Sequence, residues 1–140
     1  AFLLLLALVI SVIGSGLESV ATGFAALCAG LVHLWRMRFW HTLKTGAVPM
    51  LWILHAGHLW LAIGLLSLGL HSFGLVAEAS LAQDMLTVGC SGSMTIGMMS
   101  RVTLGHTGRL IVAGRAVTVS FLMMQGAVLT RCLAIVLREQ

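Results

Sequence analysis

Five apolar stretches run through this chain, and most of its charged side chains stand between them. The stretches cover residues 2–13, 19–35, 49–70, 84–100 and 116–137. Only 9% of the residues are charged, whereas soluble domains carry about 25%. A helix needs about 20 mostly apolar residues to cross a bilayer. The stretches therefore predict an all-α, polytopic transmembrane helix bundle of about five spans, forming a single domain over residues 1–140.

The chain opens inside an apolar run, with Ala1 rather than Met. We therefore expect the first span to be truncated and the chain to be part of a larger helical membrane protein. The partners expected from this composition are the lipid bilayer and the remainder of the parent protein.

Basic side chains follow the second and fourth stretches, whereas the segments after the first and third stretches contain no Lys or Arg. Cytoplasmic loops of membrane proteins are enriched in Lys and Arg, so the alternation predicts a multi-pass protein with both basic segments in the cytoplasm. The net charge of +4 is explained by topology, and we expect no nucleic-acid partner. The basic side chains of these segments are Arg36, Arg38, Lys44, Arg101, Arg109 and Arg115.

Four histidines are expected toward the cytoplasmic side. His33 lies near the end of the second stretch, His55 and His58 lie in the first half of the third, and His106 lies in the basic segment after the fourth. The second stretch carries small residues at helical spacing, Thr22, Ala26 and Gly30, and His33 continues this face. Gly89, Ser93 and Gly97 form a similar stripe in the fourth stretch, and such small residues let helices approach closely. An imidazole inside a span is costly and usually faces the bundle interior, and neutral imidazole is the commonest metal ligand.

Two interpretations of His55 and His58 stay open. Their spacing of three residues points both rings to one side of a helix, so they cannot hold one haem from both of its faces. They could bind copper together, or one could bind a metal while the other bonds a propionate or a carbonyl. They could also form an ordinary polar bond between helices.

The segment around His106 is the second candidate site. Gly105 and Gly108 permit close backbone approach, and Arg101 and Arg109 could pair with a haem propionate or another anion. The alternative interpretation is a positively charged cytoplasmic loop in which the glycines make the turn.

Three further polar residues carry expectations about packing. Gln125, near the middle of the last stretch, predicts a hydrogen bond to a neighbouring helix. Asp84 is expected at a helix start, where a carboxylate complements the helix dipole. Arg131 lies near the outer end of its span and is expected to extend its charge toward the membrane surface.

The sequence from Leu86 to Gly89, the pair Met94-Thr95 and the run from Met98 to Arg109 together resemble the signature of the NnrS family. The run from Pro49 to His55 also resembles this family. The resemblance implies a haem- and copper-containing protein of the bacterial inner membrane that takes part in nitric oxide stress responses or denitrification, with nitric oxide as a possible ligand.

The resemblance also implies site residues. It makes His55 and His106 the expected metal-associated residues. We include His33, His58, Arg101 and Arg109 as further cofactor-binding candidates. The chain departs from the family pattern in one place that matters, because Asp84 stands where a histidine is usual.

Other chemistry finds less support in the sequence. There is no Gly-rich phosphate loop, nucleophile elbow or pair of carboxylates, so hydrolysis is not indicated, and a redox activity is left open. The alternative function is a proton- or ion-coupled transporter or channel subunit with a histidine relay. A purely structural helical bundle is the third possibility.

Overall fold

The computed structural model describes five segments of the chain. They are residues 2–15, 19–40, 48–75, 78–108 and 112–138. The elements, in chain order, are α1 (Phe2–Ser15), α2 (Val20–Met37), η1 (Arg38–Trp40), α3 (Pro49–Ser72), α4 (Ala79–Asp84), η3 (Met85–Gly92), α5 (Ser93–His106) and α6 (Arg115–Arg138). Every one of these elements is helical, so the described residues confirm the predicted all-α class.

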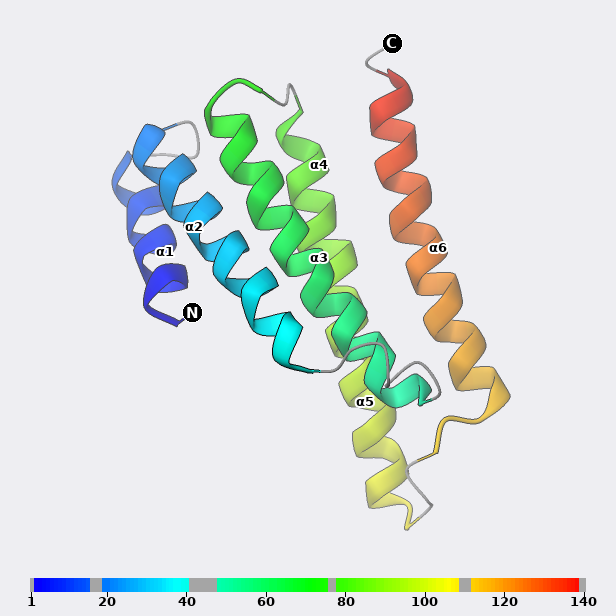
Figure 1. Ribbon diagram of the computed structural model, residues 1–140. Coiled ribbons are helices and arrows are strands. Elements are labelled where there is room, and N and C mark those ends of the chain that lie inside the picture. Colours follow the sequence, from blue (N-terminus) through cyan, green and yellow to red (C-terminus); the bar gives the residue numbers. More distant parts are fainter. Residues whose placement is uncertain (1, 16–18, 41–47, 76–77, 109–111, 139–140) are drawn as a thin grey trace.

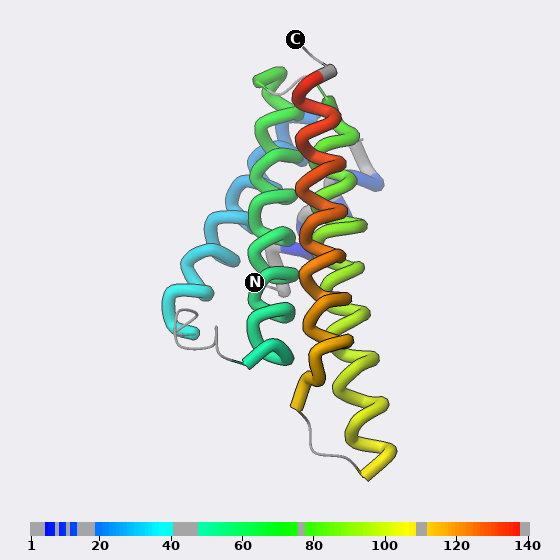
Figure 2. The backbone as a smooth tube through the Cα atoms, turned by 90° about the vertical axis from the view of Figure 1, so that its right-hand side faces the viewer, coloured from blue at the N-terminus to red at the C-terminus, as the bar shows by residue number. Residues whose placement is uncertain are grey.

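The helices form an up-and-down bundle in which α3 is central. It packs against α2 on one side and against α4, η3 and α5 on the other. The segments α4, η3 and α5 follow one another without a break and form one rod, which runs antiparallel to α3 (Figure 1). Helix α6 lies along this rod, as the rotated view also shows (Figure 2).

Three helices among the described residues are long and apolar enough to cross a membrane. They are Val20–Trp40, Pro49–Ser72 and Arg115–Leu137. These agree with three of the five expected spans and support a membrane protein. The expected span over residues 84–100 differs in extent, because the helical rod begins at Ala79 and continues to His106.

The prediction of a loop beginning at Arg101 was therefore wrong. No strong helix breaker follows Arg101 immediately. The hydroxyl groups of Thr103 and Thr107 each donate a hydrogen bond to a backbone carbonyl one turn earlier. The helix ends at His106, and the chain turns at Gly108, whose φ of +66° suits glycine.

The ends of α2 and α3 follow from local sequence. Ser19 caps α2, because its Oγ accepts the Thr22 backbone N–H at 3.1 Å. Pro49 opens α3, where its missing N–H costs nothing. Helix α3 ends in a Schellman motif in which Gly74, at φ +70°, donates to the His71 carbonyl.

Small residues let α2 and α3 approach closely. The predicted face of Thr22, Ala26, Gly30 and His33 is buried as expected. A Cβ on Gly30 would lie 2.8 Å from Leu66 Cγ and 3.1 Å from the Ala62 carbonyl oxygen. The two backbones are therefore closer than a side chain at residue 30 permits.

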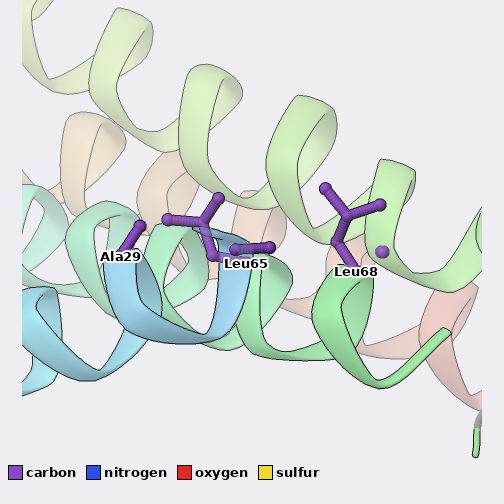
Figure 3. Close-up of a cluster of buried hydrophobic side chains, with 5 residues drawn as sticks. Ala29, Leu65 and Leu68 are labelled. Atoms are coloured by element: carbon purple, nitrogen blue, oxygen red, sulfur yellow. The ribbon is translucent and has the colours of Figure 1, made fainter. Parts of the chain in front are cut away.

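The adjoining hydrophobic core is built on the same contact. Leu65 of α3 lies beside Ala29 of α2 in Figure 3, and Leu68 lies further along α3 in the same cluster. Ala26 and Ala82 complete this cluster, and Ala82 brings in the rod of α4. Small residues on α2 and larger ones on α3 thus interdigitate, as close packing between membrane helices requires.

A second close approach joins α3 to η3. A Cβ on Gly89 would lie 2.7 Å from Trp60 Cγ, and Gly89, Ser93 and Gly97 are all buried. The π-helical winding of η3 is reflected in the Ser91 hydroxyl, which donates to Leu86 O, five residues earlier, at 3.2 Å. Such winding shifts the faces of the helix before and after it.

Polar bonds attach α6 to the rest of the bundle. Trp60 Nε1–H donates to Gln125 Oε1, and the Gln125 amide donates to Ser93 Oγ, each at 2.8 Å. The expected interhelical bond of Gln125 is thereby confirmed. Arg131 donates two hydrogen bonds, of 2.9 and 3.0 Å, to Asp84.

The expectation for Asp84 was wrong. Asp84 is the last residue of α4 and lies inside the continuous rod, not at a helix start. Its carboxylate is paired with the guanidinium of Arg131 from α6, which donates to both carboxylate oxygens. A hydropathy pattern does not predict that residues 47 positions apart will meet.

Gly30→Ala tests the close approach of α2 and α3. We expect a loss of about 1–3 kcal/mol in stability, because the added methyl group overpacks the contact with Leu66. Thermal unfolding in detergent measures it. Gly126→Ala is the matched control, since nothing lies within 4 Å of a Cβ at that helical position. Equal stability of both variants would contradict the described packing.

Asp84→Asn tests the tie between α4 and α6. We expect stability to fall, because a charged hydrogen-bonding partner of Arg131 is removed. The double exchange Asp84→Arg with Arg131→Asp should recover part of this loss in the same unfolding assay. A double variant no more stable than the sum of the two single changes would argue against a direct pair.

Candidate functional site

The antiparallel packing of α2 and α3 brings three of the predicted histidines into one region. His33 lies one turn before the end of α2, and His55 and His58 lie in the first half of α3. The end of α2 and the start of α3 lie at the same end of the bundle (Figure 1). A residue late in α2 therefore meets residues early in α3.

His33 and His58 are joined directly. His33 Nδ1 and His58 Nε2 are 3.0 Å apart and form a hydrogen bond whose donor depends on the tautomers. Both rings are buried, with 3% and 8% of their surface exposed. A polar bond between helices was one of the two interpretations left open for His58. His58 forms such a bond, and its partner is His33.

One nitrogen of this pair lacks a partner. Among the described residues, His33 Nε2 is the only buried side-chain nitrogen or oxygen without a hydrogen bond. Buried polar atoms are almost always hydrogen-bonded. His33 Nε2 therefore calls for an explanation in terms of function.

His55 is arranged differently. Its Nδ1 lies 2.8 Å from the Leu51 carbonyl oxygen, which can only accept a hydrogen bond, so Nδ1 carries the ring hydrogen. In a neutral ring, Nε2 then carries the lone pair. A backbone carbonyl that fixes the tautomer in this way is typical of histidines that bind metals. His55 is half-buried, so its ring is not sealed inside the helix interface.

Trp40 lies against both histidines of α3. Its ring centroid is 5.6 Å from that of His55, with the planes nearly perpendicular at 87°, and 4.7 Å from that of His58. The Arg36 guanidinium lies 5.8 Å from the Trp40 ring. Trp40 is the residue of this region whose role the sequence did not reveal, because a tryptophan near a span end is usually explained by the membrane interface.

The segment around His106 lies apart from this cluster. His106 is the last residue of α5, which extends past the start of α3 in Figure 1. Arg101 and His106 are both exposed, and Arg109 lies outside the described residues. The structure therefore brings together His33, His55 and His58, whereas it leaves His106 and Arg101 on the surface of the same end of the bundle.

A metal site made only of protein ligands is not gathered in the described part of the chain. No three His, Cys, Asp or Glu side chains there lie close enough together to hold a metal ion. The geometry offers instead one imidazole with a directed lone pair, His55, beside a hydrogen-bonded pair of imidazoles.

The fold and the histidine cluster define an all-helical membrane protein with polar chemistry buried between its helices. The model of the NnrS protein family matches residues 1–140, and the chain belongs to this family. Membership supports a membrane protein related to the nitric oxide response. No curated protein and no solved structure matches the chain.

Trp40→Leu tests the arrangement of the cluster. We expect the ring resonances of His55 and His58 to shift, because the magnetic field of the indole ring is removed from both. Nuclear magnetic resonance of histidine-labelled protein measures the shift. Trp35→Leu is the control, since Trp35 contacts Phe39 and Arg38 instead. Identical spectra for both variants would argue against the contacts of Trp40.

Proposed function

We propose that this chain is part of a haem- and copper-associated protein of the bacterial inner membrane that resists nitric oxide stress or takes part in nitric oxide metabolism. We further propose that His55 is a ligand to the metal. The observation that carries this proposal is the hydrogen bond from His55 Nδ1 to the Leu51 carbonyl, which leaves Nε2 with a lone pair.

The donor set fits haem better than a copper ion held by protein alone. A haem brings four equatorial nitrogens and needs one or two ligands from the protein, which a single oriented imidazole can supply. A copper site would need more donors than the described residues gather around His55. The proposed presence of copper therefore rests on the family membership alone, and no step of the proposal uses it.

Bound haem would supply an iron that takes nitric oxide as a ligand. The chain's own residues supply the setting. Helices α2 and α3 exclude water from the His33–His58 side, and Trp40 covers the two imidazoles of α3. Arg101 remains a candidate partner for a propionate, since guanidinium groups bind carboxylates bidentately, and His106 remains a second candidate ligand.

His55→Ala in the full-length parent protein tests the proposal. We expect the purified variant to lose most of its haem, measured by the Soret absorption band and by metal analysis. His71→Ala is the matched control, because His71 is also a half-buried histidine of α3 but lies at its opposite end. The wild-type protein should also change its reduced spectrum when nitric oxide is added.

Two outcomes would overturn this assignment. Absence of both haem and copper from the wild-type protein would end the proposed function. Unchanged cofactor content in His55→Ala, together with content lost in His106→Ala, would move the ligand to the end of α5.

A second candidate function is proton- or ion-coupled transport, which the buried His33–His58 bond favours. It predicts ion or proton flux in vesicles that contain the parent protein, with or without a cofactor. Flux that persists in a protein free of haem and copper would favour this function over the first.

A further inference from the structure

We propose that His33 and His58 form a proton relay between α2 and α3. The proposal goes beyond the function above, because the relay needs neither a metal at His55 nor transport across the whole bilayer. It starts from the distance of 3.0 Å between His33 Nδ1 and His58 Nε2. At this distance, one of the two nitrogens carries a hydrogen and donates it to the other.

Two arrangements of neutral rings satisfy this contact. In the first, His33 Nδ1–H donates to His58 Nε2, so that His33 Nε2 carries a lone pair and His58 Nδ1 carries a hydrogen. In the second, His58 Nε2–H donates to His33 Nδ1, so that His33 Nε2 carries a hydrogen and His58 Nδ1 a lone pair.

Passing from the first arrangement to the second moves one proton through the pair. A proton adds to His33 Nε2, the shared hydrogen moves from His33 Nδ1 to His58 Nε2, and a proton leaves His58 Nδ1. Each ring gains one N–H bond and loses one, and both are neutral before and after. The step therefore leaves no imidazolium in the apolar interface, where a charge would be costly.

The unpartnered nitrogen fits the entrance of such a relay. A bond that only joined two helices does not account for an unsatisfied atom at 3% exposure, yet His33 Nε2 has no partner among the described residues. An atom that receives a proton from a small donor must keep this position open. The relay accounts for the unpartnered nitrogen of His33.

The other end of the relay lies toward the candidate site. The His58 ring contacts Trp40, and Trp40 also contacts His55, which is half-buried. A proton that leaves His58 is thus released on the side of α3 that carries His55. Chemistry there that consumes a proton would draw on the pair.

The first test is the shared hydrogen itself. In ¹⁵N-histidine-labelled protein, we expect a scalar coupling between His33 Nδ1 and His58 Nε2, transmitted through the hydrogen bond. His55 should show no such coupling to either ring, because its Nδ1–H donates to a carbonyl oxygen. Absence of the His33–His58 coupling would overturn the proposal.

The second test separates a relay from a fixed bond. A relay requires both arrangements to be populated, so ¹⁵N exchange measurements on the wild-type protein should detect the minor one at about 1–10%. His58→Gln keeps an amide donor for His33 Nδ1 but cannot pass a proton, and should hold His33 in one tautomer. His71→Gln should retain the wild-type exchange.

A single static tautomer of His33 in the wild-type protein would overturn the relay, even if the coupling is present. Neither measurement depends on haem or copper. Failure of the relay can therefore be distinguished from failure of the proposed metal site, which is read from cofactor content.

Discussion

The close approach of α2 to α3 is the contact on which the rest of this molecule depends. Glycine and alanine on α2 remove the side chains that would hold the two backbones apart, and leucines of α3 fill the space they leave. In a bilayer, lipid tails are as apolar as leucine, so this packing and interhelical hydrogen bonds must supply the attraction. The bond between His33 and His58 lies within this interface and contributes to it.

The packing of α2 against α3 also explains why the histidines of one region form different kinds of hydrogen bond. The interface buries His33 and His58 and forces them to satisfy each other, whereas His55, one turn from His58, lies at the margin and bonds its own helix. Trp40 contacts the rings of both His55 and His58. The packing of two helices thus produces both the buried pair of His33 and His58 and a single imidazole, His55, whose tautomer is fixed by its own helix.

Much of the fold followed from the sequence. Apolar length predicted the helices, and the small-residue pattern predicted the buried faces of α2 and of the rod that contains Gly89 and Gly97. The extension of α5 to His106 could not be predicted, because basic residues such as Arg101 usually mark a cytoplasmic loop, whereas the backbone turns only at Gly108. The pair of Asp84 with Arg131 was missed because hydropathy patterns carry no information on which helices are neighbours. For the same reason, the sequence identified His33 and His58 as candidates but could not predict that they bond to each other.

The central claim is that the imidazoles of His33 and His58 face inward between α2 and α3. The most direct measurement is paramagnetic broadening of side-chain resonances by a spin label carried on lipid acyl chains. If both rings face inward, Phe24 and Leu31, which are exposed on α2, should broaden strongly, whereas both histidine rings should give sharp signals. Histidine signals broadened as strongly as those of Leu31 would contradict it.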